Sequence, residues 1–163
     1  MKRASMVVVT MLLVAGCTLP QPQGSDVAWI AAGDRIRLLQ PVAFPANESR
    51  VHLQGKGVVS ARDVTVWEPV CSLQLDHAFA EGKILPAQVF NVASVQRLEE
   101  DGSWERGVIN YVTRILFTPD ALPLRALECE VWAFGYDPSQ HVDAAAFERA
   151  TLGVLLLERA RHR

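Results

Sequence analysis

The chain has no long apolar run and no excess charge of one sign, and each of these absences excludes a class of protein. No hydrophobic run reaches the roughly 18 residues that a membrane-spanning helix needs. The 16 basic and 18 acidic residues give a net charge of −2, so the strong positive charge typical of nucleic-acid-binding domains is missing. Half of the 163 residues are hydrophobic, which excludes disorder for most of the chain and fits one folded domain.

Catalytic and cofactor motifs are also missing. The chain has no Gly-x-Ser-x-Gly and no His-Glu-x-x-His motif, and its four histidines are scattered. Gly55-Lys56-Gly57 lacks the upstream glycine and the following hydroxyl residue of a phosphate loop, so it predicts a hairpin turn. Ser72, Asp76 and His77 are triad residue types without an oxyanion-hole motif. We therefore expect no enzyme activity, no cofactor and no metal site.

The first 17 residues have the layout of a signal sequence with an attachment site. Lys2 and Arg3 precede an apolar run of 11 residues, 6–16, which ends in Val14-Ala15-Gly16-Cys17. This segment resembles the lipobox of bacterial lipoproteins, although an ordinary secretory signal with a chance cysteine is the alternative. The resemblance implies cleavage before Cys17 and acylation of that residue, including palmitate.

The resemblance also implies an organisation for the chain. Residues 1–16 would be the signal peptide, 17–25 a lipidated tether, and 26–163 a single periplasmic domain. Several acyl chains together hold a protein stably on a membrane. In Gram-negative lipoproteins an Asp after the cysteine favours the inner membrane. This chain has Thr18 there, which implies the periplasmic face of the outer membrane.

Cys71 and Cys129 remain after Cys17 is assigned to the lipid. Each lies on the apolar side of an alternating segment, with Leu73 and Leu127 as neighbours on that side. An oxidising compartment favours a disulfide between them, while two buried free thiols are the alternative. A bridge would close about 59 residues and contribute about 4 kcal/mol in the chain-entropy model.

Alternating apolar and polar residues dominate the domain and predict an antiparallel β-sandwich or small barrel. The expected strands lie within residues 34–40, 49–54, 58–66, 71–76, 87–98, 108–118 and 125–134. Residues 99–103 are expected to form an acidic turn. One helix is expected at about 143–160, capped by Asp143, with Phe147, Ala150, Val154 and Leu157 at helical spacing.

A second, looser resemblance covers residues 33–130. Gly33-Asp34, Pro45-Ala46, the strand 49–55 and Trp67-Glu68-Pro69-Val70-Cys71 are similar to a group of uncharacterised proteobacterial lipoproteins. That group implies no activity, so nothing functional follows from it.

The absence of catalytic motifs together with the membrane anchor favours a structural or interaction module in the envelope. We expect an envelope protein as partner, the membrane itself through Cys17, and no nucleic acid. The expected contact surface is the outward face with Arg50 and His52, with Trp104 and Trp132 as aromatic anchors. The alternative is a carrier of a small ligand or lipid in an apolar cavity between sheet and helix.

The lipoprotein hypothesis predicts the effect of Cys17→Ser. Because serine has no thiol for the diacylglyceryl group, the variant should remain an unprocessed precursor and lose palmitate labelling. Metabolic labelling and the mass of the purified protein measure both effects, and a variant that is still processed and labelled would contradict the hypothesis.

Overall fold

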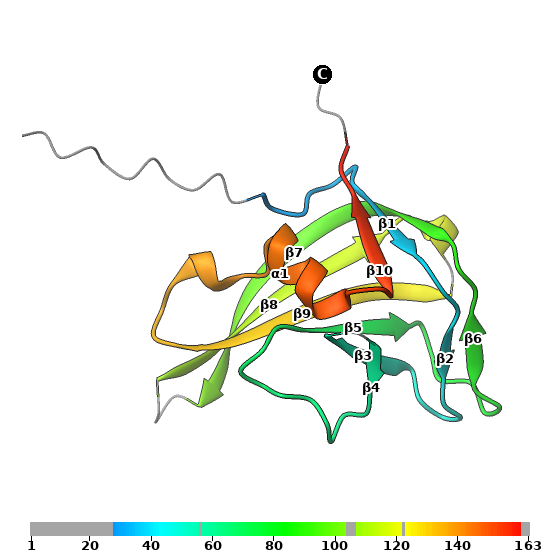
Figure 1. Cartoon of the computed structure of the whole chain (residues 1–163), viewed down its shortest axis with the longest axis horizontal. Helices are drawn as coiled ribbons and strands as arrows, with labels where there is room; N and C mark the ends of the chain where they lie inside the picture. The colour runs from blue at the N-terminus through cyan, green and yellow to red at the C-terminus, as the bar shows by residue number, and fades with distance from the viewer. Residues whose placement is uncertain (1–27, 56, 104–106, 122, 161–163) are drawn as a thin grey trace, which may run out of the picture.

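The protein is mainly β, with one large curled antiparallel sheet. The computed structural model describes residues 28–55, 57–103, 107–121 and 123–160. The sheet forms a half-barrel of eight strands in the order β10-β1-β7-β8-β9-β5-β3-β4, and β2 and β6 make a separate two-stranded ribbon beside it (Figure 1). The strands are β1 (Arg35–Leu38), β2 (Val42–Phe44), β3 (Arg50–Gln54), β4 (Gly57–Val59), β5 (Val70–Leu75), β6 (Lys83–Leu85), β7 (Val89–Ser103), β8 (Val108–Phe117), β9 (Leu124–Phe134) and β10 (Leu155–Glu158).

The predicted alternation decides which face of this sheet is buried. Ile36, Leu53, Leu73, Ile115 and Leu127 all point to one side and are almost fully buried. We call this side the inner face. It carries the hydrophobic core, and it confirms the expected mainly β fold with its short, half-buried strands.

A short helix covers the inner face. Helix α1 (Ala144–Thr151) begins at Asp143, whose side chain accepts a hydrogen bond from the Ala146 amide, as expected for an N-cap. Its residues Phe147 and Ala150 join the core beneath it, and it contacts β3, β5 and β10. The described residues also contain two 3-10 turns, η2 (Pro119–Ala121) and η3 (Pro138–Gln140). Within the described residues, no helix is long and apolar enough to cross a membrane.

The predicted helix over 143–160 is too long. It ends at Thr151, and Gly153 has a φ of +79°, a conformation that suits glycine and interrupts a helix. The following Leu155–Glu158 segment is strand β10, which pairs with β1. Buried Asp34 fixes this edge, because its carboxylate accepts the Ala31 and Ala160 amides at 3.0 and 2.8 Å.

Two other sequence expectations need correction. The acidic segment 99–103 is no turn but the end of β7, in which Glu99 pairs with Tyr111 and Asp101 with Ile109 across the ladder to β8. The expected strand within 58–66 shrinks to β4, and Thr65 instead meets the side-chain amide of Gln54. The turn expected at residues 55–57 does join a hairpin, because β3 and β4 pair with Gln54 opposite Gly57.

The Cys71 and Cys129 sulfurs are 2.06 Å apart, which is a disulfide bond. The two cysteines face each other directly across the β5–β9 ladder, and both are fully buried. They lie on the inner face among core residues that include Leu73 and Leu127. The pairing expected from the sequence is therefore present at the centre of the core.

This disulfide should contribute strongly to stability. It joins residues 58 positions apart, and loop closure of that length predicts a loss of about 4 kcal/mol in unfolding free energy when both cysteines are replaced by alanine. Urea denaturation of the wild type and the double variant measures the difference. A reductant should weaken the wild type alone, and an unchanged midpoint in both comparisons would contradict the prediction.

Candidate functional site

The outer face of the sheet carries the main polar cluster. We use outer face for the side of β3, β5, β9 and β8 that is turned away from α1. Cross-strand register brings together side chains from four strands on this face, since Arg50 lies opposite Gln74 and Ser72 opposite Glu128. The polar and aromatic side chains on this face include Arg50, His52, Ser72, Gln74, Asn110, Arg114, Glu128, Glu130, Trp132 and Phe134.

Glu128 is the centre of this cluster. Its carboxylate is buried and accepts hydrogen bonds from Arg50 Nη2 at 2.7 Å, from Gln74 Nε2 at 2.9 Å and from Arg114 Nε. Two of these three donors are guanidinium groups, so the bonds are charge-assisted. A buried carboxylate is stable only when it is paired and hydrogen-bonded in this way. Glu128 therefore fixes two arginines whose side chains remain 41% and 36% exposed.

Glu130 continues the cluster along β9. Its Oε2 accepts a hydrogen bond from Asn110 Nδ2 at 3.1 Å, and its Oε1 lies 4.0 Å from Arg50 Nη1. Glu130 is more exposed than Glu128, so water screens its attraction to Arg50. Arg50 is consequently oriented mainly by Glu128.

His52 lies next to Arg50 and is held by a serine. Its Nδ1 is 2.8 Å from the Ser72 hydroxyl, and it helps to line a hollow of about 600 Å³ together with Glu48, Arg62 and other residues. Burial lowers the pKa of His52 below its ordinary value, and the charge of Arg50 lowers the pKa further, while Glu130 and Glu48 oppose this. The imidazole is therefore neutral at pH 7.

The structure brings together only part of the predicted contact surface. Arg50 and His52 are neighbours on β3, as expected. Trp132 is on the same outer face but half-buried, and its ring packs closely over Gly102 of β7. Arg50 pairs with Gln74, and Gln74 pairs with Ala126 of β9. Trp132 is six residues along β9 from Ala126, which at ~3.3 Å per residue places it roughly 20 Å from the strand position of Arg50. Trp104 lies outside the described residues.

An exposed aromatic pair on the outer face escaped the sequence analysis. Trp67 and Phe134 stack with ring centroids 5.3 Å apart and an interplanar angle of 18°, although their exposed fractions are 54% and 71%. Phe134 ends β9, and Trp67 comes from the loop before β5. Two large aromatic side chains stacked in water are typical of a contact surface.

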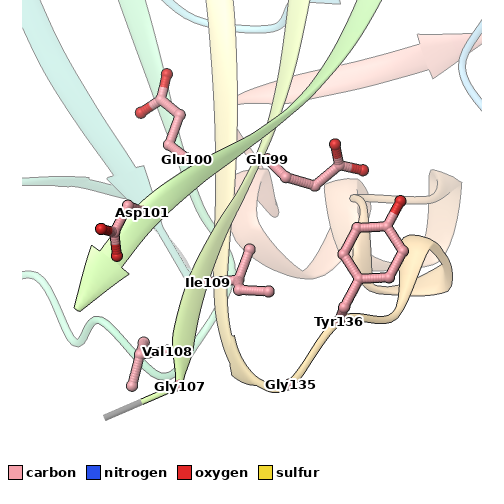
Figure 2. A pocket seen from close by; sticks show the side chains of 8 residues that line it. All are labelled: Glu99, Glu100, Asp101, Gly107, Val108, Ile109, Gly135 and Tyr136. Atoms are coloured by element: carbon pink, nitrogen blue, oxygen red, sulfur yellow. The ribbon is translucent and has the colours of Figure 1, made fainter. Parts of the chain in front are cut away.

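A second hollow lies at the far end of β7 and β8, with a volume of about 550 Å³. Figure 2 shows Glu99, Ile109 and Tyr136 on one side of the β7 ribbon and Glu100 on the other. Val108, Gly107, Gly135 and Asp101 complete the lining. This hollow is open to solvent, and its walls are mainly apolar.

Tyr111 holds one wall of this hollow in place. Its buried hydroxyl donates to the Gly135 carbonyl at 2.8 Å and accepts the Asp137 amide at 2.6 Å, so the turn that carries Tyr136 is tied to β8. His141 packs edge-on against the Tyr111 ring, and its Nε2 lies 3.2 Å from Glu99. The buried residues Tyr111 and His141 therefore hold Tyr136 and Glu99 in place at the hollow.

Large aromatic side chains pack between the sheet and the helix. Phe147 of α1 and Phe90 and Tyr111 of the sheet are fully or almost fully buried there. A hollow large enough for a small ligand lies at the end of β7 and β8, and whether the protein carries a ligand stays a prediction.

The side chains do not assemble a catalytic triad among the described residues. The Ser72 hydroxyl meets His52 instead of His77, and Asp76 comes after the end of β5. The described residues likewise contain no group of three or more histidine, cysteine or acidic side chains that could hold a metal ion. Cys17, the expected lipid-attachment residue, lies outside them.

Replacing Glu128 tests its role as the centre of the cluster. Glu128→Ala removes the acceptor of three hydrogen bonds and should lower the unfolding free energy by about 1–3 kcal/mol. The arginines can turn toward water, which keeps the loss below that of a fully buried pair. Urea denaturation at pH 7 measures it. Glu130→Ala is the matched control and should cost at most about 1 kcal/mol, so equal losses would contradict the prediction.

Neither a protein-family model, nor a curated protein, nor a solved structure matches this chain. Its function has therefore to be inferred from its own side chains.

Proposed function

We propose that this protein is a lipid-anchored envelope module that binds another envelope protein through its outer face. The observation that carries the proposal is the stacked and exposed pair of Trp67 and Phe134. Aromatic residues and arginine dominate the binding energy of protein interfaces, and this face offers both. Arg50 is already oriented by Glu128, so little side-chain entropy is lost when a partner binds it.

The anchor supports this function through its position. Acyl chains on Cys17 would hold the protein at the periplasmic face of the outer membrane, and the tether after Cys17, residues 18–25, would reach at most ~25–29 Å. A partner in the same membrane would meet the domain at a high effective concentration. Modest affinity at the outer face is then sufficient for stable association, and binding rather than catalysis is the proposed activity.

A second candidate function is favoured by the hollow in Figure 2. Its volume of about 550 Å³ and its walls of Val108, Ile109 and Tyr136 would suit a small ligand with an apolar body. Replacement of Tyr136 should impair ligand binding in this hollow but not partner binding at the outer face, so it distinguishes the two proposals.

Site-specific photo-crosslinking in living cells tests the outer-face proposal. A photoreactive amino acid in place of exposed Glu68, next to Trp67, should give a discrete adduct with one envelope protein. Trp67→Ala should reduce the adduct at least tenfold, because a central aromatic anchor contributes about 2 kcal/mol or more to binding.

Tyr136→Ala is the matched control, because Tyr136 is also an exposed aromatic residue but lines the hollow at the end of β7 and β8. The adduct at position 68 should survive this change. An adduct that depends on Tyr136 but not on Trp67, or no adduct at all, would contradict the outer-face proposal.

A further inference from the structure

Three arginines converge on a small hollow at one end of the outer face. The hollow has a volume of about 290 Å³ and is lined by Arg50, Arg114 and Arg125 with Gln74, Glu128 and two apolar residues of β8 and β9. The arginines come from β3, β8 and β9, so the arrangement exists only in the folded sheet. It lies away from the exposed aromatic pair, because Phe134 is eight residues along β9 from Ala126, roughly 26 Å.

A β-bulge places the third arginine at this hollow. Gln74 pairs with Ala126 and the next residue, Leu75, pairs with Leu124, so Arg125 is the extra residue in β9. Regular alternation would give Leu124 and Ala126 the same face and Arg125 the opposite one. A bulge re-aims a side chain in this way, and Arg125 is exposed at the hollow instead of facing the core.

Glu128 prepares the hollow without neutralising it. Both of its oxygens are already occupied, Oε2 by Arg50 and Gln74 and Oε1 by Arg114 Nε. Arg114 donates its Nε–H to Glu128. Its two terminal amino groups, at the partly exposed end of the side chain, can then donate to a ligand. In the part of the chain that the structure describes, no residue pairs with the guanidinium of Arg125. Three guanidinium groups therefore surround Glu128, and the second carboxylate, Glu130, reaches only Arg50 among them, at 4.0 Å. One positive charge remains unbalanced.

This excess of oriented positive charge favours an oxyanion with several acceptor oxygens. Guanidinium forks match phosphate oxygens geometrically and keep their charge at every physiological pH. A carboxylate carries one charge, whereas a phosphate monoester carries close to two and offers three acceptor oxygens. Gln74 adds an amide group beside the same hollow. The number of donors and their charge therefore fit phosphate better than a carboxylate side chain.

We propose that the hollow formed by Arg50, Arg114 and Arg125 binds a phosphate group, either free or as the phosphomonoester of a lipid headgroup. The site shares Arg50 with the proposed contact surface, but Arg114 and Arg125 distinguish it from the aromatic pair. Arg114 and Arg50 are positioned by Glu128, and Arg125 completes the site from the bulge.

Nuclear magnetic resonance of the full chain in neutral maltoside micelles tests this site. Inorganic phosphate replaces chloride at constant ionic strength while the Nε–H signals of Arg114 and Arg125 are followed. Both signals should shift with one saturable midpoint. Arg125→Gln should weaken phosphate binding at least fivefold, and Arg125→Lys should weaken it less, because lysine keeps the charge but loses the fork.

Arg149→Gln is the matched control, since Arg149 is exposed on α1 and its replacement removes the same charge from the other side of the sheet. Its binding of phosphate should equal that of the wild type. Arg125 is itself exposed, so an unchanged backbone amide spectrum will show that Arg125→Gln still folds. Shifts that do not saturate, or equal affinities of the Arg125→Gln and Arg149→Gln variants, would overturn the proposal.

Two water-soluble lipids distinguish the source of the phosphate. Dihexanoyl phosphatidic acid presents a phosphomonoester, whereas dihexanoyl phosphatidylcholine presents a diester capped by a cation. If phosphatidic acid shifts the same arginine signals at lower concentration than inorganic phosphate, the ligand is a lipid headgroup. If inorganic phosphate alone shifts them, the ligand is a soluble anion. Failure of both, or equal shifts with phosphatidylcholine, would overturn the site, and the crosslinking result at position 68 bears on neither outcome.

Discussion

Burial of the inner face of a single curled sheet is the constraint on which the rest of this structure depends. A half-barrel has one concave side, and here that side is filled by strand residues and by α1, with the Cys71–Cys129 bond at its centre. Because the bond joins β5 directly to β9, it fixes the register of the two strands that carry Gln74 and Glu128. The same packing that stabilises the core thus decides where Gln74 and Glu128 lie on the other side.

A buried charge on the outer face is costly unless its partners are supplied by the fold. Removal of a carboxylate from water costs several kcal/mol, and attraction to neighbouring charges offsets this only with good geometry. Glu128 achieves that geometry with donors from three other strands. Apolar residues at these positions could give similar stability. The retained network therefore favours a functional reason for holding arginines at the surface, and phosphate binding and partner binding are two such reasons.

The sequence predicted those features that depend on local periodicity. Alternation identified β3 and the cysteine-bearing parts of β5 and β9, although β5 and β9 bury residues on both sides. It failed at residues 154–157, because a short leucine-rich run is compatible with either a helix or a strand. Pairing of this segment with β1 and the positive φ of Gly153 favour the strand. The turn expected at 99–103 failed for a related reason: β8 supplies partners that make an acidic segment into a strand.

The candidate sites were predictable only where one strand sufficed. Arg50 and His52 alternate with buried residues on β3, so their outward direction could be inferred from five consecutive residues. The arrangement around Glu128 could not, because its donors lie at positions 50, 74 and 114 and meet only through the order of strands in the sheet. Arg125 was hidden more deeply still. Simple alternation assigns it to the core face, and the pairing of Leu75 with Leu124 reverses that assignment. The exposure of a basic side chain at a bulge can thus be recognised only from the strand pairing. Arg125 adds a third guanidinium group to the ion pairs of Arg50 and Arg114 with Glu128, and this extra positive charge is available to a ligand.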